Sequence, residues 1–199
     1  MKYLYTNGCS FVAGDGGTHE AAERRIEEGL TASALVATKL NCEFYNDAMG
    51  GVGNDYIVRT TMKWLLENED KWKDLIVLIG WTQFTRFELY NCFTKEYEQL
   101  NLQHQLESSF SKSLNSLKLS GIREVPKEIS ESKFWKTYMT GFYDFNDRYE
   151  KYLDNILYLQ LFLDSNNIKY VFWDSLWSLL DPRADEFLKK HMLKFNKIN

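Results

Sequence analysis

Three short polar segments that contain glycine have the residue types needed for acyl chemistry. They read Asn-Gly-Cys-Ser-Phe at residues 7–11, Gly-Gly-Val-Gly-Asn-Asp at 50–55 and Gly-Trp-Thr-Gln at 80–83. A serine in a tight turn, here Ser10, can present its hydroxyl as a nucleophile, and backbone N–H groups in glycine turns can stabilise an oxyanion. The three segments therefore predict a serine nucleophile beside an oxyanion hole.

The elements that must position these segments alternate between strands and helices. Strands are predicted at about residues 2–6, 42–46, 75–80 and 168–173. Helices are predicted at about residues 18–40, 54–66 and 144–166. The run at 75–79 is continuously apolar, which is typical of a strand that is buried on both faces of a parallel sheet. The alternation predicts an α/β fold with a doubly wound parallel sheet, in which the strand at 2–6 is central.

The carboxyl ends of the predicted strands are the expected place for a ligand. Open α/β sheets bind ligands in the crevice beyond these ends, and each of the three segments follows a predicted strand. Ser10, Gly51 and Thr82 are therefore expected to face one shared cavity. The backbone N–H of Ser10, a glycine N–H of the second segment and a polar side chain of the third could stabilise an oxyanion there.

The stretch at about residues 84–142 differs from the rest of the chain. It is polar, leans towards helix and is poor in strand signals. Its apolar content is too thin for a second independent core. We interpret it as a helix-rich insertion or cap on a single domain that spans residues 1–199.

The composition narrows the class of protein. Hydrophobic residues make up 44% of the chain and aromatic residues 16%, which excludes general disorder. A formal net charge of -4 argues against nucleic acid or an anionic membrane surface as a partner. Apolar runs are too short for a membrane helix, and the first residues are not typical of a signal peptide. A cytoplasmic protein is expected.

The patterns of cysteine and glycine residues predict no metal site and no cofactor site. Cys9, Cys42 and Cys92 are odd in number and show no C-x-x-C spacing, so they encode neither a disulfide framework nor a zinc cage. The glycine turn at 50–55 lacks the third glycine of a dinucleotide fingerprint. Cys9 has no basic residue nearby in sequence and is predicted to be a buried structural thiol.

The residues at 8–11, 48–55 and 80–83 resemble, in the same order, the first three blocks of the SGNH/GDSL hydrolase family. The likeness is greatest to the members encoded by tailed phages, and it covers roughly residues 1–90 and 143–175. It implies a flavodoxin-like, three-layer fold with Ser10 as the nucleophile and Gly51 as the oxyanion glycine. Thr82 stands where the family has its oxyanion Asn. The further candidates for substrate contact are Asn54, Arg86 and Glu88.

The general base is the part of this pattern that the sequence lacks. The Asp-x-x-His block that ends the family pattern has no match, because none of the three histidines, His19, His104 and His191, has an acidic residue three positions earlier. His191 is the only histidine that follows the last predicted strand. The alternatives are a base drawn from Asp55 or Glu88, or no base at all.

Two functions from different classes follow from this pattern. The first is a serine ester hydrolase that acts on a small molecule or on a carbohydrate ester such as an O-acetyl group. The second is a catalytically silent SGNH-like module that binds a partner or belongs to a virion, in which case the virion or a second copy of the chain is a partner. A phage origin would place the protein in the cytoplasm of the host cell or in the virion.

Each candidate residue also has a purely structural interpretation. Ser10 could serve as the N-cap of a helix, and the glycines at 50–53 could permit a turn with positive φ. Arg86 and Glu88 could form a structural ion pair. These interpretations remain open at the level of sequence.

Overall fold

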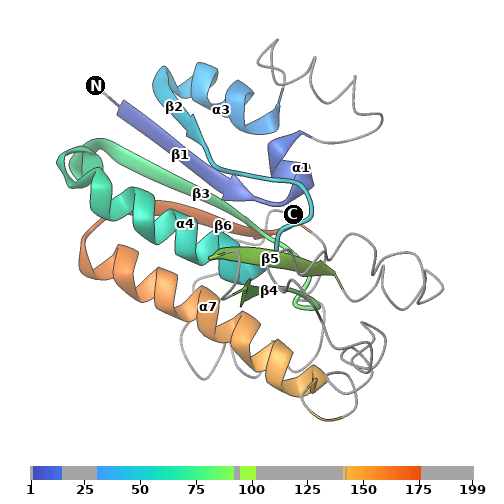
Figure 1. Cartoon of the computed structure of the whole chain (residues 1–199). Helices are drawn as coiled ribbons and strands as arrows, with labels where there is room; N and C mark the ends of the chain where they lie inside the picture. Colours follow the sequence, from blue (N-terminus) through green and yellow to red (C-terminus); the bar gives the residue numbers. More distant parts are fainter. Residues whose placement is uncertain (1, 15–30, 92–94, 102–140, 142, 176–199) are drawn as a thin grey trace.

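Four parallel strands form one sheet in the computed structural model (Figure 1). The structure describes residues 2–14, 31–91, 95–101, 141 and 143–175. The sheet contains β1 (Lys2–Gly8), β2 (Cys42–Asn46), β3 (Leu75–Trp81) and β6 (Lys169–Asp174). They lie in the order β2-β1-β3-β6, and every neighbouring pair is parallel. The predicted parallel sheet and the interior position of its first strand are confirmed.

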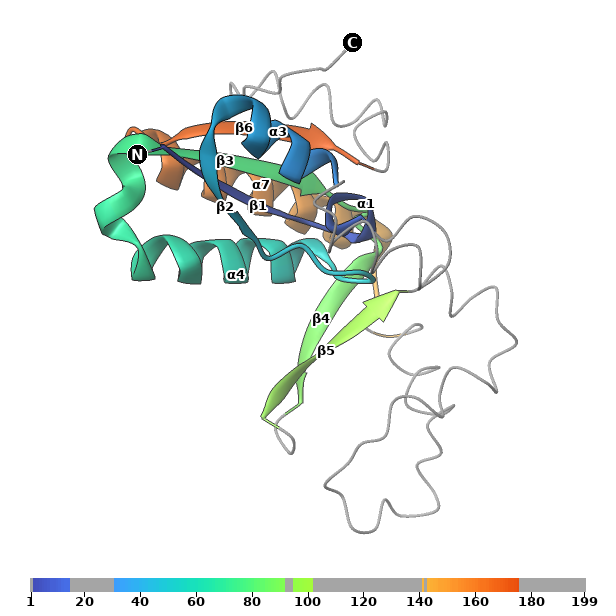
Figure 2. The ribbon, with the colours of Figure 1, turned by 90° about the horizontal axis from the view of Figure 1, so that it is seen from above.

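Helices cover both faces of this sheet. They are α1 (Ser10–Ala13), α3 (Ala32–Leu40), α4 (Asn54–Glu67) and α7 (Phe145–Ser165), with a short 3₁₀ helix η1 (Glu69–Asp74). Helices α4 and α7 lie side by side on one face, and α3 lies on the other (Figures 1 and 2). The predicted helices at 54–66 and 144–166 are confirmed. Only the second half of the helix predicted at 18–40 falls on described residues.

The main core lies between the sheet and the pair of helices α4 and α7. Alternate residues of β3, among them Val77 and Ile79, are completely buried there. Ile57 and Leu65 from α4 and Leu153 from α7 pack against them. The core therefore fixes the first turn of α4 against the sheet.

Among the described residues, no helix has the length and apolarity that crossing a membrane requires.

A β-hairpin begins the segment that was predicted to be rich in helix. Strands β4 (Arg86–Asn91) and β5 (Glu96–Asn101) pair antiparallel, so the prediction is wrong for residues 86–101. Phe87 lies opposite Leu100, and both side chains are buried. Tyr90 and Tyr97 are also paired, with ring centroids 5.1 Å apart. Such aromatic and apolar cross-strand pairs stabilise a hairpin even where charged residues lie between them. The rest of the predicted insertion lies largely outside the described residues.

Candidate active site

The order of the strands changes direction at the carboxyl edge of the sheet. The chain passes from β1 to β2 on one side and then returns to β3 on the other, so β1 and β3 are neighbours whose following segments diverge. This is the arrangement at which doubly wound sheets bind ligands. The segments that follow β1, β2 and β3 all meet at this edge (Figure 2).

Ser10 is the first residue of the short helix α1 at this edge. Its side chain is half-buried, and its hydroxyl has no hydrogen-bond partner among the described residues. The N-cap of α1 is Cys9, which rules out the alternative in which Ser10 caps the helix. The backbone N–H groups of Val12 and Ala13 both donate to the oxygen of Cys9, whereas those of Ser10 and Phe11 have no backbone acceptor among the described residues. Ser10 therefore combines an unoccupied hydroxyl with N–H groups that a ligand oxygen could use.

Two glycines allow α1 to sit directly on the end of the sheet. Gly8 pairs with Gly80 across β1 and β3. A Cβ atom on Gly8 would lie 2.3 Å from Val12 Cγ2, and one on Gly80 would lie 2.4 Å from the same atom. Any larger residue would push Val12, and with it α1, away from the strands. The glycine pair thus sets the position of Ser10.

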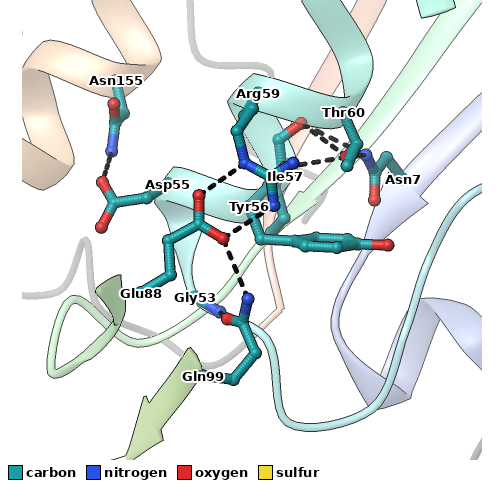
Figure 3. Close-up of polar contacts among 10 residues, drawn as sticks. All are labelled: Asn7, Gly53, Asp55, Tyr56, Ile57, Arg59, Thr60, Glu88, Gln99 and Asn155. Atoms are coloured by element: carbon teal, nitrogen blue, oxygen red, sulfur yellow. Dashed lines mark hydrogen bonds and ion pairs between the residues drawn. The ribbon is translucent and has the colours of Figure 1, made fainter. Parts of the chain in front are cut away.

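Asn7 ties the end of β1 to α4. Its buried side chain lies within hydrogen-bond distance of Thr60 Oγ1 (2.7 Å), Thr61 Oγ1 (3.0 Å) and the backbone oxygen of Ile57 (3.2 Å). Figure 3 shows this contact between the strand and the helix. Tyr5 belongs to the same network, and burial raises the pKa of its phenol far above the ordinary value. The sequence analysis missed this polar network, which fixes the residues before Ser10.

Asn54 holds the segment that follows β3. Its Nδ2 donates to the backbone oxygen of Thr82 (3.0 Å), and its Oδ1 accepts from the backbone N–H of Thr82 (3.0 Å). Its Nδ2 also lies 3.4 Å from the backbone oxygen of Gln83, so the buried amide of Asn54 positions this segment and has both donors engaged. The hydroxyl of Thr82 is itself buried and has no partner among the described residues.

The glycine turn before α4 has one open and one crowded position. Gly51 is exposed, has a φ of 80°, and has open space where a Cβ would stand. Gly53 lies against β4, where a Cβ would be 2.7 Å from the backbone carbonyl of Arg86. The backbone N–H of Met49 donates to the oxygen of Gly8 (3.1 Å), which joins this segment to the end of β1. The structure therefore brings together the segments that carry Ser10, Gly51 and Thr82.

Glu88 is bound within the protein, as Figure 3 shows. Its carboxylate accepts from Arg59 Nε (2.7 Å), Arg59 Nη2 (2.9 Å) and Gln99 Nε2 (2.9 Å). The hydrogen bond from Glu88 raises the pKa of Arg59. Glu88 thus pairs with Arg59 and not with Arg86, and it anchors the hairpin to α4.

A variant of Glu88 measures how much its bonds to Arg59 and Gln99 contribute to the free energy of unfolding. Replacing Glu88 by glutamine should lower the free energy of unfolding by about 1–3 kcal/mol, because two charge-assisted hydrogen bonds weaken. Glu67→Gln is the control, since Glu67 pairs with Lys63 at the surface and its loss should cost less than about 0.5 kcal/mol. Urea unfolding of both variants measures the difference. Equal losses would show that the Arg59 pair does not hold the hairpin.

The segment after β6 reaches the same edge. Cys9 Sγ lies 3.4 Å from Ser175 Oγ, and the backbone N–H of Ser175 donates to the oxygen of Trp81 (2.9 Å). Cys9 is completely buried, as predicted for a structural thiol. Asp174 precedes Ser175 and lies opposite Trp81 in the sheet. The sequence analysis did not count this fourth strand end as part of the site, although the argument from parallel strands applies to it equally.

The candidates for the general base fall into two groups. The carboxylates of Asp55 and Glu88 are both bonded, Asp55 to Asn155 Nδ2 at 2.9 Å. His191, together with the other two histidines, lies outside the described residues. Within the described part of the chain, no group of three or more His, Cys, Asp or Glu side chains is placed to hold a metal ion.

The fold and this edge define an α/β protein whose parallel sheet carries polar, glycine-bearing segments where β1 and β3 end. Comparison with protein-family models assigns the chain to a family. The chain belongs to DUF6071, a family of unknown function, which matches residues 15–192. No curated protein and no solved structure matches the chain.

Proposed function

We propose that this protein is an SGNH-like serine hydrolase that cleaves an ester. The observation that carries the proposal is the position of Ser10, which lies in the first turn of α1 at the carboxyl end of β1, beside the end of β3. The sheet order β2-β1-β3 is that of flavodoxin-like doubly wound folds, which is compatible with an SGNH-type architecture. The order of the motifs at 8–11, 48–55 and 80–83 supports the same assignment.

The reaction would proceed through an acyl-enzyme. The Ser10 oxygen attacks the acyl carbon as its proton passes to a base, and the carbonyl oxygen becomes an oxyanion. The N–H groups of Ser10 and Gly51 and the buried hydroxyl of Thr82 are the donors that would stabilise it. The alcohol leaves with a proton, and water then releases the acid and restores Ser10. A carbohydrate O-acetyl ester in the host cytoplasm is the substrate class that the resemblance suggests.

The hydrogen bonds of the Asp55 and Glu88 carboxylates help to decide which residue could be the general base for Ser10. Glu88 is held in an ion pair with Arg59, which favours its charged form and opposes its protonation, whereas Asp55 accepts only one hydrogen bond, from Asn155. This leaves Asp55 and His191 as the candidate bases among the residues named from the sequence. The same observation favours the second function, a catalytically silent module that binds a virion or a second copy of the chain, if neither Asp55 nor His191 reaches Ser10.

Stopped-flow hydrolysis of 4-nitrophenyl acetate tests the proposal. An acyl-enzyme route predicts a rapid burst of nitrophenolate that approaches one equivalent per chain, followed by a slower steady rate. The silent module predicts no burst and a rate equal to that of buffer with an unrelated protein. The second result would remove the esterase proposal and leave the binding module.

A further inference from the structure

A small pocket lies away from Ser10, between the start of α4, the hairpin and the first half of α7. The charged and polar side chains that line it are Asn54, Asp55, Arg86, Arg148, Lys151, Tyr152 and Asn155. Three of these side chains are cationic and one is acidic, in a chain whose net charge is -4. The pocket is therefore a local concentration of positive charge.

Arg86 is the least satisfied of these groups. Its Nε and Nη1 atoms are buried and have no hydrogen-bond partner among the described residues. A guanidinium group remains charged and offers donors only, so burial of its N–H groups without an acceptor is costly. A ligand that supplies oxygen acceptors would remove this cost.

Tyr152 provides a second, independent sign of a ligand. Its side chain is only 1% exposed, and its hydroxyl has no partner among the described residues. Burial, with a smaller contribution from the charge of Asp174, raises the pKa of Tyr152 well above its ordinary value. The phenol therefore keeps its proton and can act as a donor.

The neighbouring groups leave Arg86 Nε and Nη1 without an acceptor among the described residues. The carboxylate of Asp55 accepts from Asn155 Nδ2 at 2.9 Å and forms no hydrogen bond with these two atoms. Lys151 forms an ion pair with Asp147, with 3.0 Å between Nζ and Oδ2. The first turn of α4 adds the partial positive charge of a helix N-terminus at the same place.

We propose that this pocket binds one anionic, oxygen-bearing group, a carboxylate or a phosphate, through Arg86 and Tyr152. The guanidinium supplies the charge, and the phenol supplies a neutral donor that fixes the orientation of the group. This inference goes beyond the esterase proposal, because binding at this pocket does not require Ser10. A substrate or partner that carries such a group would be held beside the hairpin.

Thermal unfolding of the full chain tests the pocket with acetate and phosphate as probes, against chloride at equal ionic strength. At about ten times its dissociation constant, a bound anion raises the folding equilibrium constant about elevenfold and the unfolding midpoint by about 3–6 °C. Arg86→Gln should abolish this rise. Lys63→Gln removes the same charge from an exposed site and should keep it. A rise with acetate identifies a carboxylate site, and a rise with phosphate identifies a phosphate site.

Two further variants keep the test decisive. If Arg86→Gln does not fold, Tyr152→Phe should weaken binding about tenfold, because one hydrogen bond to a charged group is lost. Ser10→Ala should keep the full anion response whether or not the protein is an esterase. The proposal is overturned if neither anion raises the midpoint above that in chloride, or if the rise persists unchanged in both pocket variants.

Discussion

Replacing Ser10 by alanine is expected to lower kcat for 4-nitrophenyl acetate by at least about 10³-fold, because the variant lacks the oxygen that forms the acyl-enzyme. Any residual rate would come from the oxyanion donors alone, which act without a nucleophile. The burst of nitrophenolate should disappear together with the steady rate. Steady-state and pre-steady-state kinetics on the same preparations measure both effects.

The control for this variant is a serine elsewhere on the surface. Ser165 is exposed at the end of α7, and Ser165→Ala should retain the wild-type rate. The Ser10 hydroxyl has no hydrogen-bond partner among the described residues, so its removal should change the free energy of unfolding by less than about 0.5 kcal/mol. A Ser10→Ala protein that is folded and still hydrolyses the ester at the wild-type rate would contradict the proposed nucleophile.

Gly53→Ala is expected to lower the free energy of unfolding by about 3 kcal/mol. The added Cβ would lie 2.7 Å from the carbonyl carbon and oxygen of Arg86 and from the Cα of Phe87. These are backbone atoms of β4, so the overlap cannot be relieved by rotating a side chain, and the cost should reach the upper end of the range for overpacking. Either the hairpin must move away from α4 or the turn must deform. Urea unfolding measures the loss.

Two other glycines serve as matched controls for this substitution. Gly141→Ala adds a Cβ to a position with no atom within 4 Å and should cost less than about 0.5 kcal/mol. Gly51→Ala also enters open space, but its φ of 80° should make it cost about 1 kcal/mol. If Gly53→Ala costs no more than Gly51→Ala, the hairpin does not pack on this turn as described.

The central sheet could be predicted from the sequence because its signals are local. The continuous apolar run of β3 predicts a strand of a parallel sheet, although Ile76 and Leu78 are only partly buried, and the turn residues after β1 and β2 mark where those strands end. The parallel order then follows from the helices between the strands. The same reasoning placed Ser10 and Thr82 just beyond the ends of two strands, and β1 and β3 pair directly.

The roles of individual polar residues could not be predicted in this way. Glu88 is bonded to Arg59, 29 positions away in the sequence, and Asn54 is bonded to Thr82 at a separation of 28. No periodicity encodes such a pairing, because it depends on how β4 and α4 pack together. The hairpin itself was missed because its paired residues, such as Phe87 and Leu100, are separated by charged residues that suggested an exposed helix.

The most direct test of the account is the covalent reaction of Ser10 with an alkyl fluorophosphonate, followed by intact-mass and peptide mass spectrometry. This reagent phosphonylates a serine whose hydroxyl is activated as a nucleophile, and the adduct mimics the tetrahedral intermediate that the oxyanion donors stabilise. The account predicts a single adduct per chain, located on Ser10 and absent from Ser10→Ala. A folded protein that forms no adduct, or one that is labelled equally after Ser10→Ala, would contradict it.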